Sequence, residues 1–191
     1  MSITSPRQSN PNQWKPPSPN SVKVNFNGAV FSDSYEARVG VVIRNERGEV
    51  RASLSKKIVM PSSVEVLEML AAKRAAISAN ELGFKNVCFE GDAEGVVRSI
   101  REEDSSNAFV GHLVKDFMYI ASLFQTYSIS HVRRQGNSVA YALAREARMS
   151  FSLSIWMEDV PPNVLNLYPK IFLLNKLSPV RGNSQKRKEK E

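Results

Sequence analysis

The sequence predicts an α/β domain, a mixed sheet that carries helices on its faces. Three consecutive stretches alternate apolar and polar residues, as half-buried strands do. A long stretch, Pro61–Gly83, then changes to helical spacing, and short apolar runs alternate with further helical patterns after it. The predicted order of elements is β-β-β-α-β-α-α-β-α, so we expect five strands, the first three antiparallel.

The three predicted strands at the start are Ser21–Phe31, Tyr35–Asn45 and Val50–Met60. Gly48 lies in the short connection between the second and the third, where it supplies the positive φ of a tight hairpin turn. Strands joined by such short connections pair with their neighbours along the chain. We therefore predict an antiparallel meander.

The first predicted strand places two asparagines on one face. Val24 and Phe26 point to one side, while Asn25 and Asn27 point to the other. Gly28 follows and allows a close approach of the backbone or a bulge. A polar side chain in this position is a candidate catalytic group.

The remaining elements follow from helical spacing, capping residues and short apolar runs. In the stretch Pro61–Gly83, Ser62 and Ser63 are candidate N-caps and Gly83 is the expected end. The elements predicted after it are the strand Asn86–Glu90, the helices Ala93–Glu103 and Asn107–Phe124, the strand Tyr127–Val132 and the helix Asn137–Met149.

The 191 residues suffice for one domain with a core and for tails. We predict a disordered tail rich in Pro and Ser over residues 1–20, with Trp14 docking on the edge of the domain. The α/β domain spans residues 21–150. Residues 151–177 form an extension packed on the domain, and residues 178–191 form a basic disordered tail.

The composition favours a soluble globular protein with an anionic partner. Hydrophobic residues make up 42% and charged residues 24%, while the net charge of +7 favours a polyanion such as nucleic acid. The single cysteine excludes an internal disulfide and fits a reducing compartment, so we expect an intracellular protein, nuclear or cytoplasmic. No apolar run reaches the ~18 residues of a membrane helix. We expect a monomer that does not bind membranes.

Three polar residues from separate elements can meet at one point of this fold. Asn27 lies on the first strand, Glu68 on the first helix, and Asp92 just after the fourth strand. Oxygen ligands of this kind suit Mg²⁺, and two such ions hydrolyse phosphodiesters when they lie roughly 3.5–4 Å apart. Simpler interpretations are a solvated helix residue for Glu68, with Glu65 one turn earlier, and a helix N-cap for Asp92.

Several strings in the right order resemble a known family. NFNGA, GVVIRNERGEV, LEMLAAKRAAISANELGF, VCFEGDAEGVV and HVRRQGNSVAYALAREA are similar to the ribonuclease H-like domains of plant proteins, of the reverse-transcriptase-associated, retrotransposon-derived type. The resemblance covers about Trp14 to Trp156. It implies a five-stranded mixed sheet, a Mg²⁺ or Mn²⁺ cofactor and cleavage of the RNA strand of RNA–DNA hybrids.

The family's four carboxylate positions fall on Asn27, Glu68, Asp92 and Tyr141, which the resemblance makes the expected catalytic residues. The first three would be the metal ligands. Asn27 has the shape of Asp but no charge and a single amide oxygen. Tyr141 is a neutral phenol at pH 7 and a poor Mg²⁺ ligand. We therefore expect weakened metal binding and strongly impaired or absent hydrolysis.

The loop Arg133, Arg134 and Gln135 precedes the last predicted helix, which Asn137 begins. A solvated loop is the simpler interpretation. The functional one is that these four residues bind nucleic acid beside the site. Three hypotheses follow: a nucleic-acid-binding domain of hybrid-nuclease descent, an active hybrid ribonuclease with a degenerate site, and a non-catalytic module that binds a protein partner.

Overall fold

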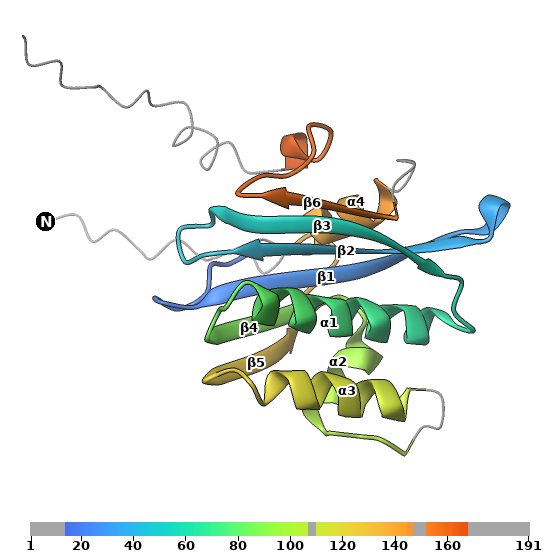
Figure 1. Ribbon diagram of the computed structural model, residues 1–191, viewed down its shortest axis with the longest axis horizontal. Coiled ribbons are helices and arrows are strands. Elements are labelled where there is room, and N and C mark those ends of the chain that lie inside the picture. The colour runs from blue at the N-terminus through green and yellow to red at the C-terminus, as the bar shows by residue number, and fades with distance from the viewer. Residues whose placement is uncertain (1–13, 107–109, 147–151, 168–191) are drawn as a thin grey trace, which may run out of the picture.

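The computed structural model describes residues 14–106, 110–146 and 152–167. In this part of the chain the strands form one mixed sheet with the order β5-β4-β1-β2-β3-β6, shown in Figure 1. The strands are β1 (Val22–Phe31), β2 (Glu36–Arg44), β3 (Val50–Val59), β4 (Asn86–Gly91), β5 (Thr126–His131) and β6 (Leu153–Met157). The helices are α1 (Val64–Glu81), α2 (Glu94–Arg101), α3 (Gly111–Ala121) and α4 (Ser138–Arg145), with 3₁₀ turns η1 (Ser32–Ser34) and η2 (Leu165–Leu167).

The strands pair as the chain order requires. β1, β2 and β3 form the predicted antiparallel meander, in which Asn27 lies opposite Gly40. β4 joins β1 in parallel, and β5 joins β4 in parallel. Each parallel connection runs through helices, because a parallel strand needs a long crossover.

The expectation of five strands is wrong by one, because the described residues form a six-stranded sheet. The additional strand, β6, lies within the predicted C-terminal extension and pairs antiparallel with β3, where Ile155 lies opposite Leu54. β6 has only five residues, and three of its apolar side chains are exposed. Its pattern alone is therefore weak, and β3 supplies the backbone partners that make it a strand.

The helices divide between the two faces of the sheet. α1 crosses in front of the sheet in Figure 1, beside α2 and α3, whereas α4 lies behind it. Two glycines permit these close approaches. A Cβ on Gly28 would meet the side chain of Leu67 in α1 at 2.4 Å, and one on Gly40 would meet the backbone of Ala140 in α4 at 2.3 Å.

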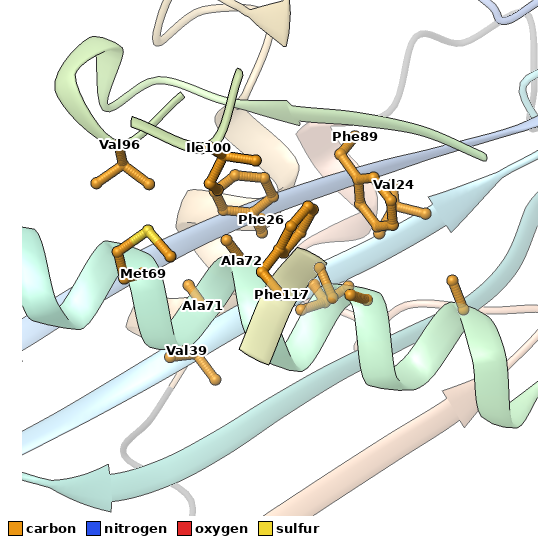
Figure 2. Packing of buried hydrophobic residues seen from close by; sticks show 14 of the residues in the cluster. Val24, Phe26, Val39, Met69, Ala71, Ala72, Phe89, Val96, Ile100 and Phe117 are labelled. Atoms are coloured by element: carbon orange, nitrogen blue, oxygen red, sulfur yellow. The ribbon is translucent and has the colours of Figure 1, made fainter. Parts of the chain in front are cut away.

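The larger hydrophobic core lies between the sheet and α1, α2 and α3. Figure 2 shows Phe26 and Val24 of β1 beside Phe89 and Phe117. The rings of Phe89 and Phe117 meet edge to face with centroids 5.2 Å apart. A smaller core under α4 contains Val42, Val139, Ala140, Leu143, Val160 and Val164.

The helix ends agree with several predicted signals. The Ser63 side chain accepts a hydrogen bond from the Val66 N–H and so caps α1, and Gly83 follows α1 with φ +74°. The later helices are shorter than predicted within the described residues. The predicted ends at residues 107–109 and 147–149 lie outside that part of the chain.

No helix in the described ranges combines the length and the apolar character that crossing a membrane requires. The division into tail, domain, extension and basic tail stays a prediction.

Candidate functional site

Asn27 and Asp92 meet where β1 and β4 lie side by side. The two strands pair in parallel, and Asp92 directly follows Gly91, the last residue of β4. The Asn27 amide nitrogen donates a short hydrogen bond to Asp92 Oδ1. Asn27 is only 3% exposed, so the amide lies inside the fold as a fixed donor. The prediction that these two side chains converge is confirmed by this contact.

Asn137 adds a second amide donor to the same oxygen. Its Nδ2 lies 3.0 Å from Asp92 Oδ1 and 2.9 Å from the carbonyl oxygen of Phe26. It therefore ties the start of α4 to both strands. Asn137 occupies the N-cap position of α4, but its fully buried side chain makes no capping hydrogen bond. Its predicted contact with nucleic acid stays a prediction. Its own Oδ1 has no partner in the described part of the chain.

Asp92 does not cap α2 either. The N-cap position is Ala93, without a side-chain bond, because the Asp92 carboxylate turns toward the amides of Asn27 and Asn137. The Arg134 side chain approaches from solvent, with Nε 3.7 Å from Asp92 Oδ2. Asp92 is thus held by two neutral donors and one cation.

Glu68 reaches the same region from α1, on the other side of β1. Its Oε1 accepts the backbone N–H of Gly28 at 3.2 Å, whereas Oε2 is buried without a partner among the described residues. Burial raises the pKa of Glu68 to about 8; the Gly28 N–H opposes this rise and the negative charge of Asp92 adds to it. Glu68 is therefore mostly protonated at neutral pH, and the prediction of a solvated residue is excluded.

Tyr141 lies one turn into α4. Its backbone N–H donates to Asn137 at 3.0 Å. The phenol oxygen accepts a 3.4 Å hydrogen bond from Arg145, and within the described ranges no hydrogen bond joins it to Asp92, Asn27 or Glu68. The guanidinium carbons of Arg134 and Arg145 lie 5.5 and 5.7 Å from the centre of its ring. Tyr141 is therefore the centre of a cationic and aromatic group, and its expected catalytic role stays a prediction.

The structure therefore brings Asn27, Glu68, Asp92 and Asn137 together, and we call these four residues the Asp92 site. Arg134 connects the Asp92 site to Tyr141. Arg133 and Gln135 are exposed in the loop before α4. Their predicted role in binding nucleic acid stays a prediction.

Two features escaped the sequence reasoning. Arg145 follows Tyr141 by four residues, a spacing that places both side chains on one helix face and could have indicated the contact. The second feature is a group of buried polar side chains beside the Asp92 site, which we call the Trp14 cluster: Trp14, Lys23, Asn25, Arg44 and Glu90. Sequence alternation placed Asn25 on the polar face, but no local signal joins it to Glu90.

A family model described as "Reverse transcriptase-like" matches residues 25–147. The chain belongs to this family. The matched residues include every member of the Asp92 site, together with Arg134, Tyr141 and Arg145. A search of functionally curated proteins finds no match.

Solved structures of ribonucleases H share the fold of this family member. RNase H1 of the halophilic archaeon Halobacterium salinarum NRC-1 is 26% identical, with a TM-score of 0.62 over 66% of this chain and 96% of that one. LC11-RNase H1, solved in complex with an RNA/DNA hybrid, is 21% identical, with a TM-score of 0.59 over 66% and 95%. The foamy viral protease-reverse transcriptase in complex with an RNA/DNA hybrid is 16% identical, with a TM-score of 0.54 over 79% and 22%.

These matches confirm the predicted α/β ribonuclease H-like fold. The chain is an RNase H-like domain related to RNA–DNA hybrid nucleases.

The residues of the Asp92 site do not fit the pair of divalent ions that the family resemblance implies. Two amide N–H groups point at Asp92 Oδ1, where an ion would need free lone pairs. In the described part of the chain no three His, Cys, Asp or Glu side chains are grouped so that they could hold a metal ion.

Proposed function

We propose that this chain is a nucleic-acid-binding domain of hybrid-nuclease descent whose own hydrolysis of phosphodiesters is strongly impaired or absent. The observation that carries the proposal is the hydrogen bond from the Asn27 amide to Asp92. The resemblance implies a carboxylate at the Asn27 position. Here the side chain supplies a neutral hydrogen-bond donor in place of a negative charge.

The charges at this end of the sheet support binding and disfavour hydrolysis. Burial raises the pKa of Glu68 to about 8, and Arg134 lies 3.7 Å from the Asp92 carboxylate. The net charge of +7 and the exposed residues Arg133, Arg134 and Arg145 favour attraction of a phosphate backbone. RNA/DNA hybrids are present in complexes of two structural neighbours, LC11-RNase H1 and the foamy viral enzyme. We extend that partner class to this chain.

A hybrid-cleavage assay with Mg²⁺ or Mn²⁺ tests the catalytic half of the proposal. We expect no turnover above background, with an intact RNase H1 as the positive control. The double variant Asn27→Asp, Tyr141→Asp restores acidic groups at both altered positions, and we expect it to gain cleavage. Wild-type turnover comparable to the RNase H1 would establish the active ribonuclease instead.

Salt dependence of binding tests the other half. Binding that depends on phosphate contacts weakens steeply as the salt concentration rises, because counterions are released from the nucleic acid. We expect this behaviour with a labelled RNA–DNA hybrid, and a smaller slope for the variant Arg133→Ala, Arg134→Ala. No detectable binding at low salt would leave the protein-interaction module as the better hypothesis.

A further inference from the structure

Four side chains from the end of β1, from α4 and from the loop before α4 alternate between aromatic rings and guanidinium groups. The Arg145 guanidinium lies 6.0 Å from the Phe31 ring and 5.7 Å from the Tyr141 ring. The Arg134 guanidinium lies 5.5 Å from the centre of the same Tyr141 ring. We call this the aromatic–arginine row: Phe31, Arg145, Tyr141 and Arg134.

The row is open to solvent. Arg134 and Arg145 are exposed, whereas Tyr141 and Phe31 are half-buried. The Arg134 side chain is 77% exposed and its approach to Asp92 is loose at 3.7 Å, so it can turn toward an incoming phosphate at little cost. Beside the row lies an open hollow, whose lining consists of Ser138, Tyr141, Ala142, Arg145, Glu146, Asn163 and Val164.

Aromatic faces that alternate with cations are the combination that proteins use for single-stranded nucleic acid. Bases stack on the rings, and the cations contact the phosphates between them. A base inside a duplex is stacked on its neighbours and cannot present its face to a protein ring. A single strand can, because its bases are free to turn outward.

We propose that the aromatic–arginine row binds single-stranded nucleic acid, with one base stacked at Tyr141 and the flanking phosphates contacting Arg134 and Arg145. The inference rests on the proposed nucleic-acid binding and names its preferred substrate class. The same substitution that removes the fourth acidic group of the family then adds a stacking platform. A hybrid, in contrast, binds through its phosphates alone.

The test measures fluorescence anisotropy of one labelled RNA strand, alone and annealed to its DNA complement, with the full chain at low salt. We expect the single strand to bind at least several-fold more tightly than the hybrid. Tyr141→Ala should weaken single-strand binding about tenfold, since stacking on one base contributes ~1–3 kcal/mol. Tyr141→Phe keeps the ring and should bind like the wild type.

Two controls separate the row from general effects. Tyr119→Ala removes an exposed tyrosine of α3, on the opposite face of the sheet, and should leave both affinities unchanged. Arg145→Ala should weaken the single strand, whereas Arg98→Ala, on the exposed side of α2, should not. Circular dichroism of each variant confirms that it is folded.

The outcomes distinguish this inference from the proposed function. Tight, salt-dependent binding of the hybrid with an unchanged affinity in Tyr141→Ala would overturn the inference and leave the proposed function intact. Equal loss of affinity in Tyr141→Ala and Tyr141→Phe would also overturn it, because the ring would then not be the stacking group. No binding of either nucleic acid would overturn both.

Discussion

Glu90 and Asp92 are two residues apart at the end of β4, and each meets an asparagine of β1, but their surroundings differ. Both oxygens of Glu90 have protein donors, Lys23 Nζ at 2.6 Å and Asn25 Nδ2 at 3.1 Å. Asn25 Oδ1 in turn accepts from Arg44 at 2.7 Å. The Glu90 carboxylate is therefore neutralised and hydrogen-bonded inside the protein.

The Trp14 side chain covers this group. Its indole N–H donates to Asn25 Oδ1 at 3.1 Å, and the Arg44 guanidinium lies 3.9 Å from the ring centre. Around Asp92 the donors are two neutral amides and an exposed arginine, and Glu68 Oε2 nearby has no partner in the described ranges. The Trp14 cluster thus satisfies its carboxylate and is closed to ligands. The Asp92 site is incompletely satisfied and open on the side of Arg134.

This difference indicates that the Trp14 cluster stabilises the fold, whereas the Asp92 site is available for binding. Buried polar groups contribute to a stable fold when every member is bonded. Polar atoms left without partners reduce stability, and they persist where another constraint keeps them. The following predictions test this division by changing matched residues in the two groups.

The largest expected effect comes from breaking the buried ion pair of the Trp14 cluster. Lys23→Met keeps the aliphatic stem but leaves Glu90 buried without its cation, and we expect a loss of ~3–5 kcal/mol in the free energy of unfolding. Urea denaturation measures it. Lys57→Met, which breaks the exposed pair with Glu36, should cost far less, because solvent screens that pair. Equal effects would show that the Trp14 cluster is not a closed, buried group.

The second effect concerns Glu68 and depends on pH. Its pKa of about 8 in the folded protein exceeds the ordinary glutamate value of 4.5, so the folded state holds the proton more tightly than the unfolded chain does. Stability from this group is complete below pH 4.5 and is lost as the pH rises through 8. Glu68→Gln imitates the protonated acid and should remove this loss.

We therefore expect Glu68→Gln to be more stable than the wild type by ~2–4 kcal/mol at pH 8.5, and by much less at pH 5.5. Urea denaturation at both pH values provides the measurement. Glu65→Gln, on the exposed first turn of α1, is the control and should show no such pH dependence. A stability difference that is the same at both pH values would contradict the raised pKa.

The third prediction compares the two asparagines directly. Asn27→Asp places a second carboxylate against Asp92, and repulsion should lower the free energy of unfolding by ~1–3 kcal/mol when EDTA removes divalent ions. Millimolar Mg²⁺ should restore most of the loss, with each kcal/mol seen as about 2–4 °C in Tm. Asn25→Asp creates the same juxtaposition with Glu90.

Mg²⁺ should not rescue Asn25→Asp, because Lys23 and Arg44 already occupy the positions around that carboxylate pair. The wild type should show no Mg²⁺-dependent change in Tm either. A rescue of both variants by Mg²⁺ would mean that the surroundings of Glu90 and Asp92 are equivalent. That result would contradict the distinction between the Trp14 cluster and the Asp92 site.

Much of the fold could be predicted because its signals are local. Alternation in β1, β2 and β3, the Ser63 cap and the glycine after α1 depend on neighbouring residues alone. β6 could not be predicted from its five residues, since its pairing partner β3 is about 100 residues earlier. Long-range pairing of this kind leaves little trace in a short sequence window.

The site could be predicted only in part, because some of its features depend on contacts between distant segments. The order of elements and the family resemblance predicted that Asn27, Glu68 and Asp92 lie in one region, and the contacts agree, while their catalytic roles stay predictions. The burial of Glu68 was not predictable, because it depends on α1 being packed between the sheet and α3, while the apolar Val64 on the same helix remains exposed. The sequence pattern of α1 alone does not indicate that a glutamate lies on a side of the helix that the sheet or α3 covers.

The smallest effect concerns Trp14, which lies in the predicted N-terminal tail and covers the Trp14 cluster. Trp14→Phe removes only the N–H donated to Asn25, whose Oδ1 still accepts from Arg44, so we expect a loss of ~1 kcal/mol in the free energy of unfolding. Trp14→Ala also removes the ring beside Arg44 and should cost ~2–3 kcal/mol. Urea denaturation of both variants gives the values. Two variants with wild-type stability would show that the indole ring does not close the cluster, and then the contrast between Glu90 and Asp92 would depend on Lys23 and Asn25.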